Sequence, residues 1–496
     1  MNSWLALATT IAVARAFSVS GTSLLDSDHV YKVDTVEQPP SDFSIKATST
    51  RKQSVLASSN SSSTTLPWQS GMSFIDSDSN NESYTVNVTI GDSEYPLLID
   101  TGSAYLWIYD SNCTDSSCSG KQLYPISSGT NSSSSFSLAY SSGSASGKVV
   151  TDTLQLGSLS ADEFEFGAAS SVPDLFEDYS FSGVLGLPAV NSSNGLTNLV
   201  TFLKNQETIS QGTFALCLGS YDTALDGSNN GLLVLGKDIQ ELYDGSIHYS
   251  SVVENTNNYW QVVVDSVSAD SYQISFDEAE IDGQDSQTKR LAVVDSGTTS
   301  IVAASADATK IHSFFSDSIT DGDNFAILCN STLTLNFKIA GSSWSLGPDD
   351  YLGNAYGSGK YDGYCVSNIV GSSSLDNGTW ILGSLFLRNY YVSFDLDQSR
   401  LGLADRNSVE IVASMSSASP TQSTVSASST ASTGSASSAS TLSTKTSSVS
   451  TSKATSASSS VSAASLSSAS SATVSNLAGK LQLASPLLLL SLLSLI

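Results

Sequence analysis

Basic residues are scarce in this sequence. Its 496 residues include 20 Lys and Arg against 47 Asp and Glu. In the central part, residues 68–408, we count 41 acidic and 12 basic side chains. Nucleic acid and anionic membrane surfaces carry the same sign of charge, so we expect neither as a partner. Acidic surroundings would neutralise part of this charge and relax its self-repulsion.

Histidines are fewer still. The three of them, His29, His248 and His312, form no His-Glu-x-x-His helix and no recognisable catalytic triad. The sequence therefore offers little for zinc-dependent or nucleophilic hydrolysis, and we predict neither a metal site nor a cofactor.

Cysteines number only five. Cys113 and Cys118 lie close together, and Cys329 and Cys365 bracket one segment, so two local disulfides are the economical pairing in an oxidising compartment. Cys217 is left over within an apolar run, where we expect a buried, inert thiol rather than a reactive one.

The two ends of the chain differ from its middle. Residues 1–16 form a short apolar run that ends in Ala-Arg-Ala, which predicts a signal peptide; the alternative is a buried N-terminal helix. Residues 17–66, with an uncertain end, are expected to be a precursor segment. Residues 410–475 are almost only Ser, Thr and Ala and read as an O-glycosylated stalk that cannot bury a core.

Residues 476–496 end in a charge-free apolar tail too short to span a bilayer. Small residues, a spacer and such a tail predict a glycosylphosphatidylinositol anchor signal, with attachment near Asn476; a plain membrane tail is the alternative. We therefore expect a protein of the secretory pathway, attached to the plasma membrane or cell wall. Eight sequons agree with that route, at Asn60, Asn81, Asn87, Asn112, Asn131, Asn191, Asn330 and Asn377.

The middle of the chain repeats itself. Short runs rich in Val, Ile, Thr, Tyr and Phe between turn residues predict an all-β, mainly antiparallel fold, with helices only near 199–204 and 306–315. Apolar residues lead into Asp100-Thr101-Gly102-Ser103 and again into Asp295-Ser296-Gly297-Thr298. An apolar-apolar-Gly run follows 86 and 88 residues later. The same order and nearly equal spacing predict duplicated lobes, 67–245 and 246–409.

Each repeated acid precedes a glycine at a strand end, a place for a tight turn. One such turn is usually structural. Two turns in matching places of duplicated lobes could bring Asp100 and Asp295 into one site, where they would share a proton. One carboxylate could then take a proton from water while the other donates to a carbonyl oxygen, which is the division needed to hydrolyse an amide.

At these residues the chain resembles the pepsin-like aspartic proteases, over Tyr84 to Arg406. The resemblance implies a bilobal fold, a catalytic dyad of Asp100 and Asp295, and peptide or protein substrates cut by a monomer. It also implies supporting roles for the residues around the acids, a flap over the cleft, and disulfides Cys113–Cys118 and Cys329–Cys365. The supporting residues would be Thr101, Gly102, Ser103, Ser296, Gly297 and Thr298, and the flap residues Tyr140 and Gly143, with Trp107 pairing with Tyr140.

The stalk and anchor signal make the chain similar to the fungal yapsin-type branch, which implies a preference for basic residues beside the cut. Asp174, Glu177 and Asp178 would attract them, unless they only form a solvated acidic loop. Two other classes stay open: a catalytically dead binding protein of this fold, and a cell-wall mannoprotein whose stalk is the working part. The intact acids and glycines argue against the first.

Overall fold

The computed structural model describes residues 25, 30–36, 65–78, 81–140, 143–193, 195–219, 231–281, 284–357, 359–376, 378–407 and 409–412. Contacts divide the chain into Met1–Ser414 and Met415–Ile496, and all described residues belong to the first unit. Several sequence predictions lie outside the described residues and stay predictions: the signal peptide, the stalk beyond Val412, the anchor signal, and Asn60, Asn377 and Asn476.

The expected all-β fold is confirmed, since strands dominate the described chain. Strand β4 (Tyr84–Ile90) shows why its residues form a strand: Tyr84, Val86, Val88 and Ile90 are buried and the positions between them are not. Alternate side chains of a strand point to opposite faces, so this pattern buries one face of the sheet.

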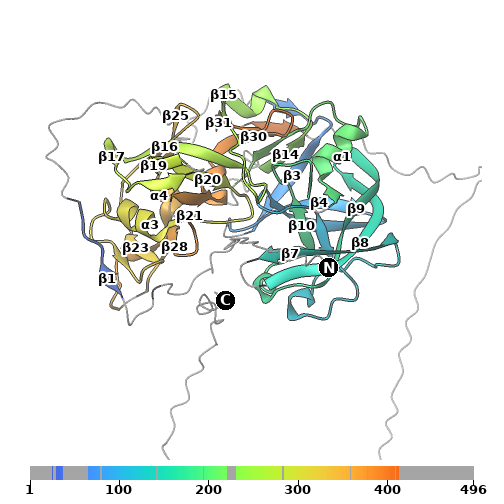
Figure 1. The fold of residues 1–496 in the computed structure, drawn as a ribbon, viewed down its shortest axis with the longest axis horizontal. Helices are drawn as coiled ribbons and strands as arrows, with labels where there is room; N and C mark the ends of the chain where they lie inside the picture. The colour runs from blue at the N-terminus through green and yellow to red at the C-terminus, as the bar shows by residue number, and fades with distance from the viewer. Residues whose placement is uncertain are drawn as a thin grey trace, which may run out of the picture. The chain divides into compact units, whose positions relative to one another are not determined.

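The largest sheet has 13 strands, and strands from residues 390–406 lie in it beside strands from the first half of the chain (Figure 1). The lobe boundary expected at residues 245 and 246 falls inside its first strand. In spatial order the strands are β15 (Tyr243–Ser251), β31 (Arg400–Arg406), β30 (Tyr390–Asp395), β13 (Thr213–Cys217), β14 (Gly231–Leu235), β3 (Met72–Ser77), β4, β5 (Ser93–Asp100), β10 (Gly183–Gly186), β6 (Trp107–Tyr109), β9 (Leu159–Ser171), β8 (Gly143–Leu156) and β7 (Thr130–Tyr140).

Two further sheets come from the second half of the chain, apart from one strand of the precursor segment. The eight-stranded sheet has the order β25 (Ser342–Leu346), β24 (Leu335–Ile339), β16 (Gln261–Ala269), β20 (Arg290–Val294), β29 (Thr379–Leu382), β21 (Ile301–Ala304) and β28 (Ile369–Ser372), with β17 (Tyr272–Ile274) on β16. The five-stranded sheet has the order β1 (Tyr31–Lys32), β22 (Ile319–Thr320), β23 (Phe325–Leu328), β27 (Tyr364–Ser367) and β26 (Leu352–Ala355).

Three strand pairs complete the β structure. Two are local: β11 (Ser192–Ser193) with β12 (Leu196–Thr197), and β18 (Ala279–Ile281) with β19 (Gln284–Gln287). The third joins distant segments, because β2 (Thr65–Pro67) runs parallel to β32 (Glu410–Val412). Leu66 is buried in this pair, so the uncertain end of the precursor segment coincides with a strand of the folded unit.

Helices are few and short. Helix α1 (Leu199–Asn205) agrees with the expected helix, and it begins where the Asn198 side chain accepts a 2.9 Å hydrogen bond from the Thr201 N–H. Helix α3 (Ser305–His312) agrees with the second. The others are α4 (Pro348–Tyr351), α5 (Ser384–Leu387) and the 3₁₀ turns η1 (Ser116–Cys118), η2 (Asp174–Phe176) and η3 (Gln240–Leu242). Within the described chain, no helix has the length and apolar character needed to cross a membrane.

Both expected disulfides, Cys113–Cys118 and Cys329–Cys365, are present. Cys217 is a free cysteine, buried on β13, and burial raises the pKa of its thiol. A protonated, enclosed thiol is a poor nucleophile, which agrees with the expectation of an inert side chain.

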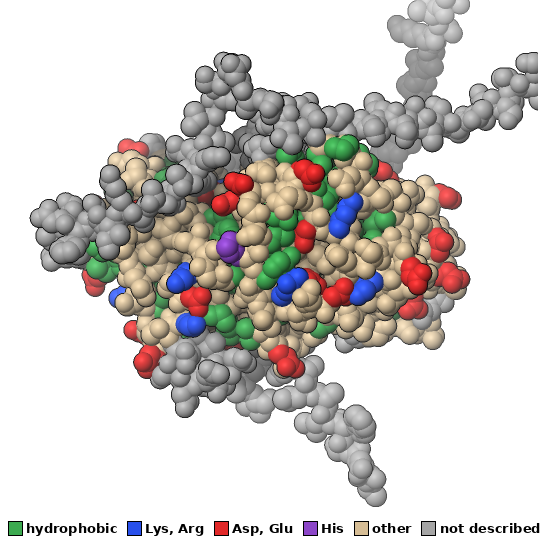
Figure 2. All heavy atoms as spheres, turned by 90° about the horizontal axis from the view of Figure 1, so that it is seen from above, with side chains coloured by type: hydrophobic (Ala, Val, Ile, Leu, Met, Phe, Trp, Pro, Cys, Tyr) green, Lys and Arg blue, Asp and Glu red, His purple; other side chains and the backbone are tan. Residues whose placement is uncertain are grey.

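The surface carries both signs of charge. On the face shown in Figure 2, basic side chains lie next to acidic ones and are not gathered into one patch. Among the described sequons, the side chains of Asn87, Asn112, Asn191 and Asn330 are exposed and that of Asn81 is half-buried; nothing is described for the side chain of Asn131.

Candidate active site

The two repeated acids end two equivalent strands. Asp100 is the last residue of β5, which pairs in parallel with β10, and the Leu187 N–H donates to the Asp100 carbonyl at 2.9 Å. Asp295 follows β20, which pairs in parallel with β29, and its own N–H donates to the Leu382 carbonyl at 3.0 Å. The second element of each repeat therefore forms the strand that lies beside the acid.

Each carboxylate is held by its own turn. Both side chains are buried, with 5% of each residue exposed. Both accept one hydrogen bond from a glycine N–H and one from a hydroxyl, which fixes the carboxylate plane. The donors are Gly102 N–H to Asp100 Oδ1 (2.8 Å), Gly297 N–H to Asp295 Oδ1 (2.9 Å), Thr298 Oγ1 to Asp295 Oδ2 (2.6 Å) and Ser103 Oγ to Asp100 Oδ2.

Each glycine also lies against the opposite acid. A Cβ atom on Gly102 would lie 2.7 Å from Asp295 Oδ1, and one on Gly297 would lie 2.5 Å from Asp100 Oδ1. Atoms cannot approach so closely, so both positions require glycine. The structure therefore brings the carboxylates of Asp100 and Asp295 into one site.

Two hydroxyls lock the turns together. The Thr101 hydroxyl donates to the Val294 carbonyl at 2.9 Å and accepts from the Ser296 N–H at 3.0 Å. In the mirrored arrangement, the Ser296 hydroxyl donates to the Ile99 carbonyl at 2.8 Å and accepts from the Thr101 N–H at 3.1 Å. Thr101, Ser296, Val294 and Ile99 are all buried, so the loss of any of these hydrogen bonds would leave an unsatisfied polar atom.

Electrostatics favour a shared proton. Burial, and then the charge of Asp295, raise the pKa of Asp100 well above its usual range. The nearby Tyr259 is affected as well: burial first, and then Asp295 and Asp100, raise the pKa of its hydroxyl to about 12. A pair that holds one proton contains both an acid and a base.

A hairpin places Tyr140 over this pair. Tyr140 ends β7 and stands opposite Gly143, the first residue of β8; the two residues between them lie outside the described chain. The Trp107 Nε1–H donates to the Tyr140 hydroxyl at 2.7 Å, and that hydroxyl lies 3.5 Å from Ser103 Oγ. Since Ser103 also donates to Asp100, the expected Trp107–Tyr140 pair connects to the dyad.

The family model described as eukaryotic aspartyl protease matches residues 83–406. The chain belongs to this family. It is 30% identical over 336 residues to the aspartic-type endopeptidase ctsD of Aspergillus fumigatus, covering 66% of each chain, so it spans just under two thirds of that relative. It is also 28% identical over 326 residues to the probable aspartic-type endopeptidase CTSD of Arthroderma otae (65% of this chain, 81% of the relative), and 28% identical over 331 residues to pepsin A of Bos taurus (64% and 82%).

The expected likeness to pepsin-like aspartic proteases is thus confirmed, while the yapsin-type assignment stays a prediction. In this aspartyl protease an aromatic cluster adjoins the hairpin. The ring of Phe176 lies 5.8 Å from Trp107, 5.0 Å from Tyr140 and 5.6 Å from Phe181, between ring centroids. These rings exclude water from one side of the site.

Sequence reasoning missed Glu82. Its carbonyl accepts a 2.8 Å hydrogen bond from the Thr299 hydroxyl, in the loop after the second acid. Its side chain is half-buried, and burial, with the charge of Asp78, raises its pKa to about 7. A single glutamate in a polar loop belongs to no motif, so only the fold could reveal its position.

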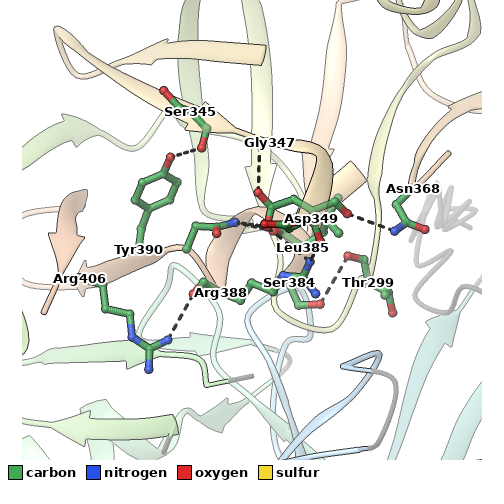
Figure 3. Close-up of polar contacts among 12 residues, drawn as sticks. Thr299, Ser345, Gly347, Asp349, Asn368, Ser384, Leu385, Arg388, Tyr390 and Arg406 are labelled. Carbon is green, nitrogen blue, oxygen red and sulfur yellow. Dashed lines mark hydrogen bonds and ion pairs between the residues drawn. The ribbon is translucent and has the colours of Figure 1, made fainter. Parts of the chain in front are cut away.

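A polar network supports the loop after the second acid of this aspartyl protease (Figure 3). The Ser384 hydroxyl, at the start of α5, donates to the Thr299 carbonyl at 3.4 Å. At the end of α5, the Arg388 guanidinium donates to Asp350 Oδ1 at 3.4 Å, and Asp350 Oδ2 accepts from the Gly347 N–H at 3.0 Å. Helix α5 therefore holds the loop, and α4, which carries Asp350, holds the end of α5.

Proposed function

We propose that this chain is an aspartic endopeptidase that hydrolyses peptide bonds at acidic pH through Asp100 and Asp295. The observation that carries the proposal is the mutual contact of the two turns, in which each glycine lies against the opposite carboxylate. Family membership and the printed activities of the relatives support it.

In this mechanism the ionised carboxylate takes a proton from a water molecule, which attacks the scissile carbonyl carbon. The protonated member of the pair donates its proton to the carbonyl oxygen. The tetrahedral intermediate collapses when the carboxyl that took the water proton donates it to the leaving nitrogen, while a hydroxyl of the intermediate returns its proton to the other carboxylate. The hydroxyls of Ser103 and Thr298 hold the carboxylates in place during these transfers.

The test is a pH profile of peptide cleavage by precursor-free wild type, Asp100→Asn, Asp295→Asn and the double variant. We expect each single change to lower kcat by about 100-fold or more. The double change should lower kcat little further, because the two acids act as one unit. Asp317→Asn, on the exposed surface, is the control. Full activity of either single variant, or a wild type active only above neutral pH, would contradict the proposal.

We further propose that the protein is a monomer that is secreted and held at the cell surface by a lipid added near Asn476. The charge-free C-terminal tail and the sequons support this. Phosphatidylinositol-specific phospholipase should release the enzyme from cells, and mass analysis should find the tail missing. A protein that resists effective treatment and retains Ile496 would instead carry a membrane tail.

We also propose a preference for Lys or Arg beside the cut, as in the yapsin-type branch. Asp174, Glu177 and Asp178 support it, because they are exposed and flank Phe176, whose ring contacts the hairpin tyrosine. Lys121 lies among them and donates to the Glu177 carbonyl at 3.3 Å, which offsets part of their charge. The test is a peptide-library digest by wild type and by the variant Asp174→Asn, Glu177→Gln, Asp178→Asn. If both cut mainly beside Leu and Phe, these acids form only a solvated loop and the proposed preference is wrong.

A further inference from the structure

Part of the expected precursor segment is a strand of the folded enzyme. Strand β1 pairs antiparallel with β22, with Tyr31 opposite Thr320 and Lys32 opposite Ile319. The pairing continues beyond the strand, since the Val33 N–H donates to the Ser318 carbonyl at 3.0 Å. Figure 1 shows this segment, coloured blue, at the edge of the sheet that contains the yellow β23.

Apolar side chains anchor this segment. Leu25 is 5% exposed and packs with Ile319 and Ala326, while Val33 is 6% exposed and belongs to the main hydrophobic core. The ion pair of the segment, Lys32 with Asp317 at 2.8 Å, is exposed at both side chains and contributes little. Burial and backbone pairing therefore hold the segment in place.

The sheet that receives β1 is separate from the dyad. This sheet includes neither β5, which ends in Asp100, nor β20, which Asp295 follows. The disulfide Cys329–Cys365 ties this sheet, because Cys365 pairs with Ile327 of β23 and Cys329 directly follows that strand. This disulfide braces the sheet through residues that lie outside the precursor.

We propose that the segment around β1, anchored through Leu25 and residues 30–36, is a permanent part of the C-terminal lobe and stays bound as a separate short chain when the precursor is cut between residues 37 and 64. Loss of the segment would expose the edge of β22 and uncover the apolar surface around Ile319 and Ala326. An unpaired edge over an apolar patch favours aggregation. The mature enzyme would then have two chains and two N-termini, one of them from the precursor.

The experiment controls the cut directly. A recognition sequence for a site-specific protease is inserted between Ala57 and Ser58 of the full chain, in the inactive Asp295→Asn background so that the protein does not process itself. After cleavage, size-exclusion chromatography at acidic pH and mass spectrometry of the main peak follow. We expect the N-terminal fragment to co-elute with the catalytic part at equal amounts. If this fragment, with its precursor sequence unchanged, elutes apart from the catalytic part, the proposal is overturned.

Variants separate specific docking from incidental retention. The change Val33→Asp together with Leu25→Asp should release the fragment, whereas Tyr31→Ser, at a residue that is 54% exposed, should retain it. Retention in the double variant would show that these anchors are wrongly assigned. Should that variant fail to fold, hydrogen exchange of the cleaved wild type decides: the amides of Val33 and Val36 should stay protected, and exchange at the rate of a free peptide would overturn the proposal. The outcome does not depend on catalysis, so it is separable from the proposed activity.

Discussion

The indole N–H of Trp107 donates to the Tyr140 hydroxyl at 2.7 Å, and this bond fixes the hairpin residue that stands nearest to the dyad. The same hydroxyl lies 3.5 Å from Ser103 Oγ, the donor to Asp100. The position of the hairpin and the orientation of the carboxylate are therefore linked through two side chains.

Loss of the Tyr140 hydroxyl should lower kcat/KM by about five- to tenfold, the value of one net hydrogen bond, without moving the pH optimum. The change is Tyr140→Phe. Tyr109→Phe is the matched control, because the buried Tyr109 hydroxyl makes no hydrogen bond within the described residues while its ring also packs on Trp107. Steady-state kinetics across the acidic range measure both, and a shifted optimum in Tyr140→Phe would mean that this hydroxyl exchanges protons with the dyad.

Gly102→Ala should lower activity at least about 100-fold, because the new methyl group would lie 2.7 Å from Asp295 Oδ1 and displace it. Gly357→Ala places a methyl group where no atom of the described residues lies within 4 Å, so it should behave as wild type. Peptide cleavage and circular dichroism of both variants distinguish a displaced carboxylate from a misfolded protein. Wild-type activity of Gly102→Ala would mean that the two turns lie farther apart than described.

The buried pair of Arg290 and Asp307 should be essential for stability. Arg290 Nε donates to Asp307 Oδ2 at 2.6 Å, and Trp380 Nε1 donates to the same oxygen at 2.8 Å. Asp307→Asn leaves a buried guanidinium uncompensated and should cost about 3–5 kcal/mol of unfolding free energy. The control is the exposed ion pair of Asp265 and Lys289. Asp265→Asn removes this pair and should lower the free energy of unfolding by no more than about 1 kcal/mol. Urea denaturation compares them, and equal effects would refute the special role of burial.

His312 should make the fold less stable in acid. Its ring is buried, stacks on Phe325 and contacts Ser367 Oγ at 2.9 Å, and burial lowers its pKa to about 4. The unfolded chain, with an ordinary pKa near ~6.5, binds the proton first, so stability falls as the pH drops from about 6.5 to about 4, by about 3 kcal/mol in all.

Urea denaturation between pH 7 and pH 4 measures this slope. His312→Gln removes the titrating ring, so its stability should fall less over that interval than that of wild type, whatever its stability at pH 7. His248→Gln, which replaces an exposed histidine in the same way, is the matched variant for comparison. Parallel slopes for wild type and His312→Gln would assign the acid sensitivity to the many carboxylates instead.

The sequence predicts the site better than its surroundings. Asp100 and Asp295 are visible because a repeat marks them, and Thr101 and Ser296 follow from the family resemblance. Strand β1 was missed because it has two residues and its partner lies almost 290 positions away, so neither periodicity nor a turn signals it. The sequence also does not predict that strands from the two halves of the chain join in the 13-stranded sheet. A pairing such as β13 with β30 depends on tertiary packing, which local composition does not encode.

Strands β2 and β32 lie side by side and run in the same direction, with Leu66 opposite Ile411. A pull on the chain beyond Val412 acts first on β32, so the pairing with β2 must break before the pull reaches β31. Separating the pair would also expose the buried Leu66 side chain to water, which adds to the cost. If the enzyme is tethered through its C-terminal segment, this pair absorbs mechanical pull before the force reaches the two catalytic turns.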